Sequence, residues 1–160
     1  MSVGVSLEDP VFVSVPASSM ERMRQFYRTV LAPARYREVV KVENGIMMIG
    51  YAAMSERRDK PDDPPDLWLR PVPDGQTISP IYISLPVYNC RNVTKEINEF
   101  YTAAIQQGAK EKHVPKFRHI TEDKECYYNA TVIDPEGNEL SLIDGLKYEW
   151  YKETPEGRDA

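Results

Sequence analysis

Residues 10–16 read Pro-Val-Phe-Val-Ser-Val-Pro, and residues 80–86 read Pro-Ile-Tyr-Ile-Ser-Leu-Pro. Each stretch places a short apolar run between two prolines, which is typical of a β-strand. Two further features follow in the same order in each half: a Phe-Tyr pair in an amphipathic stretch, at 26–27 and 100–101, and a Leu-x-Leu strand, at 67–69 and 140–142. A duplicated α/β unit is the simplest interpretation, and this repeat decides the fold.

The first unit covers about residues 10–73. Ser18 and Ser19 before Met20-Glu21 predict a capping-box start, and apolar residues then recur every three or four positions, so we expect a helix from Met20 to Leu31. Asn44-Gly45 is a strong hairpin signal. The expected strands are 11–15, 36–42, 46–51 and 66–72, and the charged, proline-rich stretch 55–65 is expected to be a solvated loop, with a lid as the alternative.

The second unit covers about residues 79–144 and repeats this order. Apolar residues from Val93 to Ile105 line one face of a helix that ends at Gly108. The polar segment 110–124 is expected to be a solvated or gating loop. The expected strands are 79–86, 126–133 and 139–143, the last two joined by a turn over 134–138, and the aromatic tail 145–160 is expected to dock on the body or on a second subunit.

Bulk properties favour one compact domain over residues 1–160. A net charge of −5 argues against a nucleic-acid partner, because affinity for duplexes depends largely on lysine and arginine neutralising phosphates. The start of the chain has no signal-peptide pattern and no apolar run is long enough to span a bilayer, so we expect a soluble cytoplasmic protein without a membrane partner. Cys90 and Cys126 are expected to be reduced thiols.

The order strand, helix, three strands, given twice, resembles the vicinal oxygen chelate superfamily, which includes glyoxalase I, extradiol dioxygenases and bleomycin-resistance proteins. The resemblance rests on residues 10–18 with the following Phe-Tyr pair and on residues 127–138, and it extends from Pro10 to Ile143. It implies an α+β fold in which two βαβββ units form paired curved mixed sheets around one cavity, and it implies a homodimer. Because this fold hosts isomerases, lyases, dioxygenases and drug-binding proteins, it does not name a reaction.

Metal-dependent members of that superfamily hold a divalent ion on the first and last strands of each unit. The matching positions here are Pro10, Trp68, Pro80 and Ser141. Proline offers no side-chain donor atom, and a neutral serine and an indole cannot replace carboxylate and imidazole. We therefore expect no metal ion and no cofactor.

A second metal cluster is conceivable in the polar segment before the strand at 126–133. Its members would be His113, His119, Glu122, Asp123 and Cys126. The two histidines are six positions apart in a segment without helical periodicity, which is not a standard ligand spacing. A solvated or gating loop is the preferred interpretation of this segment, with Arg118 and His119 as candidates for substrate contact.

Strand alternation predicts which side chains line the cavity, because successive residues of a strand point to opposite faces. If the valines of the first strand face the helix, Phe12 and Ser14 face the cavity, and a slip of one residue would reverse every assignment. The residues expected to contact a ligand are Phe12, Ser14, Trp68, Arg70, Ser84, Arg118, Asn129, Thr131 and Ser141, and the candidates for proton transfer are Tyr82, His119, Tyr127 and Glu139.

An aromatic and hydroxyl-rich lining suits a hydrophobic, oxygenated small molecule, with Arg70 available for a carboxylate or enolate. We expect a metal-independent isomerase, lyase or cyclase. The alternative is a protein that binds or sequesters a small molecule, as in the bleomycin-resistance branch, and a third reading is a degenerate structural subunit. An enzyme would release a changed product, a binding protein would return its ligand unaltered, and a structural subunit would not be stabilised by ligands.

Overall fold

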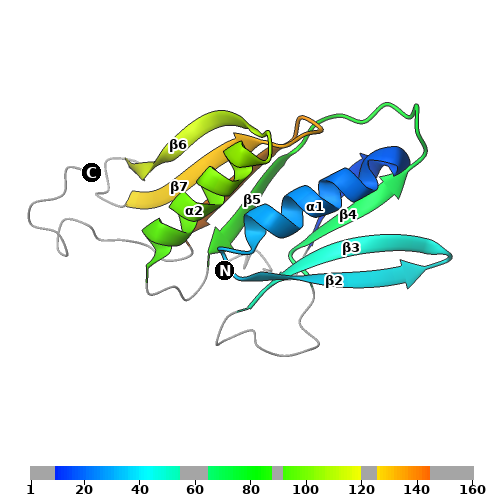
Figure 1. Ribbon diagram of the computed structural model, residues 1–160, viewed down its shortest axis with the longest axis horizontal. Coiled ribbons are helices and arrows are strands. Elements are labelled where there is room, and N and C mark those ends of the chain that lie inside the picture. Colours follow the sequence, from blue (N-terminus) through cyan, green and yellow to red (C-terminus); the bar gives the residue numbers. More distant parts are fainter. Residues whose placement is uncertain (1–9, 55–64, 88–91, 120–125, 145–160) are drawn as a thin grey trace, which may run out of the picture.

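The structure is a computed structural model, and it describes residues 10–54, 65–87, 92–119 and 126–144. It confirms the repeat, because each half contains a strand, a helix and three further strands (Figure 1). In chain order the elements are β1 (Val11–Pro16), the 3-10 turn η1 (Ala17–Ser19), α1 (Met20–Leu31), β2 (Tyr36–Glu43), β3 (Ile46–Ala53), β4 (Leu67–Val72), β5 (Tyr82–Val87), α2 (Val93–Gln106), β6 (Lys110–His119), β7 (Cys126–Ile133) and β8 (Glu139–Asp144).

The strands form two four-stranded mixed sheets with the same topology. Sheet A has the order β1-β4-β3-β2 and sheet B the order β5-β8-β7-β6. In each sheet the first strand of the unit is parallel to the last, and the other pairs are antiparallel. The expected α+β class with two βαβββ units is therefore confirmed.

Both helices lie side by side on the same face of the two sheets (Figure 1). The hydrophobic core fills the space between helices and sheets, because every second residue of the central strands points toward the helices. The two units share one continuous core, which includes Val13, Met23, Val30, Ile49, Leu69, Ile83, Ile97, Phe100, Ala130 and Leu142.

The local signals at two turns are confirmed. Asn44 and Gly45 have φ angles of 52° and 76°, the left-handed pair that a two-residue type I′ hairpin requires. Gly108, with φ of 90°, follows the end of α2. These turns are encoded by the few residues that tolerate positive φ, so sequence alone locates them.

Residues 110–119 form β6, so the expected loop over 110–124 is wrong for this part of it. β6 runs antiparallel to β7, from Lys110 opposite Ile133 to His119 opposite Cys126. Lysine and glutamate have low strand propensity, so only the backbone hydrogen bonds to β7 make this polar segment a strand. Because β6 is the edge strand of sheet B, its polar side chains can stay in water.

The predicted capping box at the start of α1 is also wrong. Ser19 is the N-cap residue but makes no side-chain capping hydrogen bond. Ser18 instead turns away, and its backbone N–H and its hydroxyl both donate to Asp74 Oδ1, at 3.0 and 2.9 Å. These two hydrogen bonds lower the pKa of the exposed Asp74 carboxyl, the backbone one more than the hydroxyl. The Ser18 hydroxyl therefore bonds to Asp74 in the loop after β4 and does not cap the helix as the local pattern predicted.

A buried hydrogen bond joins the two units. The Tyr27 hydroxyl of α1 donates to Asp134 Oδ2 in the turn before β8, at 2.6 Å. The same carboxylate accepts from the backbone N–H groups of Glu136 and Asn138, both at 2.9 Å, and so holds the turn together. Burial, followed by the nearby Asp134 charge, raises the pKa of Tyr27 well above its ordinary value, so the hydroxyl stays a donor.

Several predictions fall outside the described residues. They concern most of the loop 55–65, Cys90, the pair Glu122-Asp123 and the tail 145–160. Within the described part of the chain, neither α1 nor α2 nor any other helix has the length and hydropathy to cross a membrane.

Candidate functional site

The alternation predicted for the strands is confirmed, so the nine residues selected for ligand contact share one face. Val13 and Val15 of β1 are fully buried toward the helices, and Ile83 and Leu85 of β5 repeat this pattern. We call the opposite face of the two sheets the helix-free face. Its members on β1, β3 and β4 of sheet A and on β5, β7 and β8 of sheet B are Phe12, Ser14, Gly50, Ala52, Trp68 and Arg70 in the first and Tyr82, Ser84, Asn129, Thr131, Glu139 and Ser141 in the second.

In sheet A the helix-free face is apolar at its centre. Trp68 lies between Phe12 on β1 and Gly50 on β3, and its side chain is buried. A Cβ atom at Gly50 would lie 2.8 Å from two indole carbons and 2.7 Å from Pro65 Cγ, so only glycine fits beneath the indole. The absence of a side chain at Gly50 leaves room for the Trp68 indole. We call Trp68 and its neighbour Phe12 the aromatic floor of sheet A.

The cationic side chain of Arg70 lies at the margin of this aromatic floor. The Arg70 guanidinium carbon is 5.3 Å from the centroid of the Phe12 ring, within the range of a cation–π contact. Phe12 is 43% exposed although it is aromatic, so its ring is open to a ligand as well as to water. Phe12, Ser14, Trp68 and Arg70 are therefore brought together as neighbours on β1 and β4.

In sheet B the same face is polar. Asn129 Nδ2 donates to Ser141 Oγ at 3.3 Å, and Arg118 Nε donates to Asn129 Oδ1 at 2.5 Å. Thr131 lies directly opposite Ser141 in the β7–β8 pairing. Asn129, Thr131 and Ser141 are 7%, 1% and 1% exposed, although a sheet that served packing alone would fill such positions with apolar side chains. Together with Arg118 they form one group of neighbouring polar residues, all predicted to contact the ligand. Ser84 lies beside Ser141, on β5.

The four candidates for proton transfer separate into two pairs. Tyr82 and Glu139 lie directly opposite each other on β5 and β8. Tyr127 and His119 lie near the other end of sheet B, where Arg118 is opposite Tyr127 and His119 is opposite Cys126. Ile133, the neighbour of Glu139, is six positions along β7 from Tyr127, which is roughly 20 Å of extended strand. The two pairs cannot act on the same atom of a small ligand.

The immediate surroundings of the first pair are partly charged. Glu139 forms an ion pair with Lys112 of β6, and both side chains are about one third exposed, at 32% and 38%. Tyr82 is 59% exposed, so its ring and hydroxyl are accessible. The side chain of His119 lies outside the described part of the structure.

Two adjoining hollows lie where the units meet. Their volumes are about 200 and 210 Å³, and they share Ser14, Gln76, Ile78 and Asn138. The first is also lined by Phe12 and by Ile81, the residue before Tyr82, whereas neither Tyr82 nor Glu139 is among the lining residues of the two hollows. Sequence reasoning missed Gln76 and Ile78, because the segment between the units matches no strand or helix pattern.

Asn138 is also a residue that the sequence pattern identified only as part of a turn. Its Oδ1 accepts from the backbone N–H of Ile81 at 3.0 Å, and its Nδ2 donates to Asp134 Oδ2 at 3.0 Å. It therefore fixes the start of β5 against the turn before β8 and shapes the wall of the hollows. Its hydrogen-bond partner Asp134 also accepts the hydrogen bond from the Tyr27 hydroxyl.

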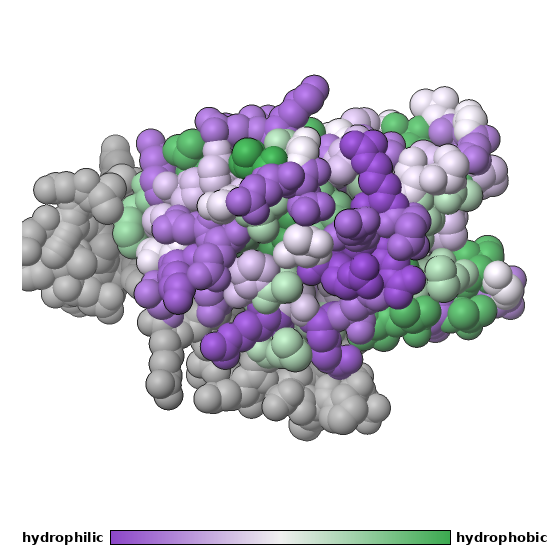
Figure 2. Space-filling view, viewed as in Figure 1, coloured by the Kyte–Doolittle hydropathy of each residue, from purple (hydrophilic) through white to green (hydrophobic). Residues whose placement is uncertain are grey.

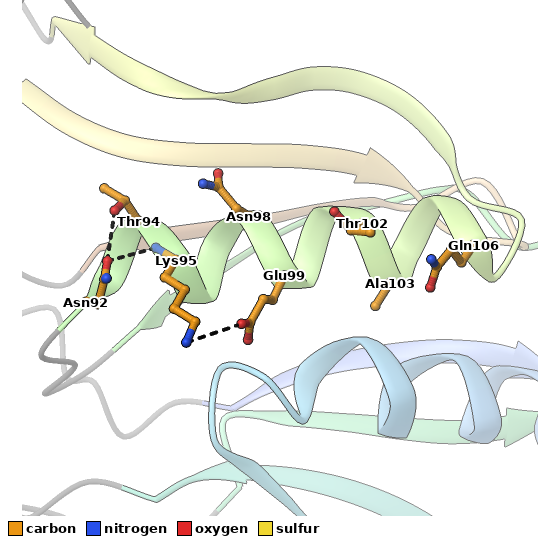
Figure 3. Close-up of a pocket in the computed structure, with 8 residues that line it drawn as sticks. All are labelled: Asn92, Thr94, Lys95, Asn98, Glu99, Thr102, Ala103 and Gln106. Carbon is orange, nitrogen blue, oxygen red and sulfur yellow. Dashed lines mark hydrogen bonds and ion pairs between the residues drawn. The ribbon is translucent and has the colours of Figure 1, made fainter.

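A larger hollow of about 430 Å³ runs along the outer side of α2 (Figure 3). Its side chains are polar and largely occupied with one another: Asn92 accepts from the backbone N–H of Lys95 at 3.1 Å, and Lys95 lies 3.9 Å from Glu99. Asn98 accepts from the Tyr128 hydroxyl at 2.6 Å. Because α2 and its N-cap residue Asn92 supply all eight lining residues and none is a sequence-predicted site residue, the helix-free face is the better candidate site.

The residues at the positions that hold a metal ion in similar proteins do not fit one. Trp68 is enclosed by Gly50 and Pro65, and the Ser141 hydroxyl already accepts from Asn129. Pro10 and Pro80 have no donor atom in their side chains. Within residues 10–54, 65–87, 92–119 and 126–144, no three His, Cys, Asp or Glu side chains gather closely enough to hold a metal ion. The absence of a metal requirement stays a prediction, because it concerns the whole chain.

Comparison with known proteins identifies the fold. No protein-family model matches the sequence, and no curated protein matches it. A glyoxalase/bleomycin resistance protein from Albidiferax ferrireducens matches the structure with a TM-score of 0.56 and 16% identity, over 84% of this chain and 97% of that one. A glyoxalase/bleomycin resistance protein/dioxygenase family enzyme from Burkholderia phytofirmans matches with a TM-score of 0.52 and 15% identity, over 88% and 98%.

A glyoxalase I mutant from Zea mays matches with a TM-score of 0.54 and 16% identity, and the chain spans 46% of its length. The chain therefore has the glyoxalase/bleomycin resistance protein/dioxygenase fold, which is the vicinal oxygen chelate fold that the repeat predicted. At these identities the likeness establishes the fold and leaves the reaction to be argued from the site.

Proposed function

We propose that this protein binds a hydrophobic, oxygenated small molecule on the helix-free face and converts it without a metal ion, as an isomerase, lyase or cyclase. The observation that carries the proposal is the division of that face. Its sheet A half is aromatic around Trp68, and its sheet B half holds the buried polar group around Asn129. A ligand with one apolar end and one oxygenated end would complement both halves.

Each predicted residue has a role in this proposal. Phe12 and Trp68 would contact the apolar part of the ligand, and Arg70 would bind a carboxylate or enolate at its margin. Ser14 and Ser84 would provide hydroxyls on β1 and β5, which are outer strands of the two sheets. The sheet B group of Arg118, Asn129, Thr131 and Ser141 would bind the ligand oxygens.

Tyr82 and Glu139 are the pair that we propose for proton transfer. They are neighbours on adjacent strands at the end of sheet B where β5 and β8 begin, whereas Tyr127 and His119 are at the far end of the sheet. Adjacent residues of paired strands are about 5 Å apart, which allows one group to give a proton and the other to accept one on the same ligand. Tyr127 and His119 would then contact the ligand only if it were long.

The alternative function is binding or sequestration without reaction. It is supported by the Lys112–Glu139 ion pair, which occupies the carboxylate that proton transfer would need. The names of the similar solved structures, which include bleomycin resistance proteins as well as glyoxalases, support both functions. The acidic net charge of −5 would suit a cationic ligand.

The test starts with a panel of hydrophobic oxygenated molecules and a thermal-shift measurement, since a ligand that binds only the folded protein raises its melting temperature. Hits are then incubated with the protein, with and without a chelator, and recovered for mass spectrometry and NMR. A changed product that forms equally with chelator supports the proposal, and an unaltered ligand bound at one per chain supports sequestration. If no molecule stabilises the protein, both functions fail and a structural subunit is the remaining interpretation.

Two variants separate ligand contact from packing. Arg70→Ala and Tyr82→Ala should lower turnover or affinity at least about tenfold and leave the melting temperature nearly unchanged, because both side chains are exposed. Lys95→Ala on the outer side of α2 is the matched control and should change neither. Equal losses of activity and stability in the first two variants would assign them to packing.

The expected homodimer and the cytoplasmic location also remain proposals. The first is tested by sedimentation of the purified chain and the second by cell fractionation. Neither depends on the identity of the ligand.

A further inference from the structure

Strand β2 is one of the two outer strands of sheet A, and no other strand of the described residues pairs with its outer edge. β2 and β3 pair in continuous register, and just past the end away from the Asn44-Gly45 turn the backbone N–H of Met54 donates to the carbonyl of Arg35 at 2.8 Å. In an antiparallel pair every second residue bonds to its partner strand. The odd-numbered residues of β2 therefore bond to β3, and the N–H and C=O groups of Glu38, Val40 and Val42 point away from the sheet.

The same edge carries exposed apolar side chains. Val40 and Val42 are 49% and 66% exposed, and Met47, which pairs with Val42, is 43% exposed. Figure 2 shows apolar residues gathered at the end of the β2–β3 hairpin. An exposed apolar edge strand is a template for pairing with another chain, and native proteins usually cover it.

The charges of β2 select one register for pairing with a second copy. An antiparallel pair related by a two-fold axis through the sheet keeps side chains of the same face together. Centred on Val39, such a pair places Arg37 opposite Lys41, and centred on Lys41 it places two lysines opposite each other. Centred on Val40, it places Arg37 opposite Glu43 on both sides of the axis. Centred on Val42, it places Lys41 opposite Glu43, but only residues 41–43 of each β2 would then pair, whereas the register centred on Val40 pairs residues 37–43. The register centred on Val40 is therefore the one that combines attractive charges with a long pairing.

We propose that β2 pairs antiparallel with β2 of a second copy, centred on Val40, so that the two A sheets become one continuous sheet. This inference rests on the proposed homodimer and not on the proposed ligand. Val40 would bond to Val40 of the second copy, and Glu38 to Val42, through the backbone groups that point outward. Glu43 would then exchange its contact with Lys41, a 3.3 Å ion pair between side chains more than half exposed, for Arg37 of the second copy.

The first test is sedimentation velocity of the full chain at concentrations from about 1 to about 500 μM, the range in which a weak edge pairing associates. We expect a dimer whose fraction rises with concentration. Val40→Pro removes one outward N–H and no bond to β3, so it should abolish the dimer while the melting temperature stays within a few degrees. A wild-type chain that is monomeric throughout this range would overturn the proposal.

The second test is a charge exchange, which stays informative if proline disturbs the strand. Glu43→Arg should weaken association about tenfold or more, because it places two arginines opposite each other on both sides of the axis. Arg37→Glu should weaken it similarly, and the double variant Arg37→Glu, Glu43→Arg should restore it. High salt should weaken the wild-type dimer, since the pairs are exposed.

Two results would contradict this interface while leaving the homodimer intact. One is a dimer that persists in Val40→Pro with unchanged affinity. The other is a dimer that is insensitive to both charge reversals but is lost in Trp150→Ala, which would assign the interface to the C-terminal tail. Loss of the dimer in Val40→Pro together with recovery in the double charge variant would establish the proposed register.

Discussion

The two units have the same backbone order but different helix-free faces. When the Leu-x-Leu strands 67–69 and 140–142 are aligned, Gly50 opposite Trp68 in sheet A corresponds to Thr131 opposite Ser141 in sheet B, so the aromatic floor of one unit matches a polar network in the other. The helix-facing residues, such as Leu69 in one and Leu142 in the other, are alike. The two units share the side chains that pack against the helices, and they differ in the chemistry of the helix-free face, which no helix covers.

The largest expected effect comes from giving unit one the residue of unit two. Gly50→Thr should lower the free energy of unfolding by about 3 kcal/mol, because its Cβ would lie within 2.8 Å of Trp68 and Pro65. Urea unfolding measures this change. Adding Trp68→Ser should recover part of the loss, since it removes the indole and recreates the pair of sheet B. If Gly50→Thr is as stable as the wild type, the aromatic floor is not tightly packed.

The Phe-Tyr pairs give the next comparison. Tyr27→Phe should cost about 2 kcal/mol of stability, because it removes a buried hydrogen bond to the Asp134 carboxylate. In the second unit Tyr101 donates to Glu111 at the surface, so Tyr101→Phe is the matched control and should have little effect. If the two variants lose the same free energy of unfolding in urea, the hydrogen bond between the units adds no stability beyond that of a surface hydrogen bond.

The Tyr27 contribution should depend on pH in a defined direction. Burial raises the pKa of Tyr27 above its unfolded value of about 10, so the folded state keeps a proton that the unfolded state loses. The contribution is therefore complete below about pH 10 and is lost as the pH rises above it. Burial also raises the pKa of Tyr51, so Tyr27→Phe should flatten the alkaline fall in stability without removing it. An unchanged slope in the variant would contradict the assignment.

A smaller effect is expected in the polar network. Ser141→Ala should cost about 1 kcal/mol, because the Asn129 amide loses an acceptor in a buried site. Under the proposed function it should also weaken ligand binding by more than this stability loss explains. Ser84→Ala on the exposed neighbouring position is the control, and it should alter binding without a measurable change in unfolding.

The smallest stability change is expected at the margin of the aromatic floor. Arg70→Ala should change the free energy of unfolding by about 0.5 kcal/mol or less, since its contact with Phe12 is exposed. Arg70→Lys keeps the charge but changes the planar group, so it separates stacking from attraction of an anionic ligand. A loss well above 1 kcal/mol in urea unfolding would mean that Arg70 supports the fold.

Much of the candidate site followed from the alternation of the strands. Phe12 and Ser14 were placed on the helix-free face by the pattern of β1 alone, and the buried valines beside them confirm that register. The clustering could not be predicted in the same way. Tyr82 and Glu139 are far apart in the sequence and meet only because β5 and β8 pair in parallel.

The sequence by itself determined the duplicated unit, α1, α2 and the Asn44-Gly45 hairpin, because periodicity and positive-φ residues act over a few neighbouring positions. Only the tertiary structure decided that the polar residues 110–119 form a strand, that Ser18 bonds to Asp74, and that Tyr27 reaches Asp134. These contacts depend on partners that are distant in the chain. A short-range pattern carries no information on which partner a free backbone edge or a buried hydroxyl finally meets, because packing of the whole chain makes that choice.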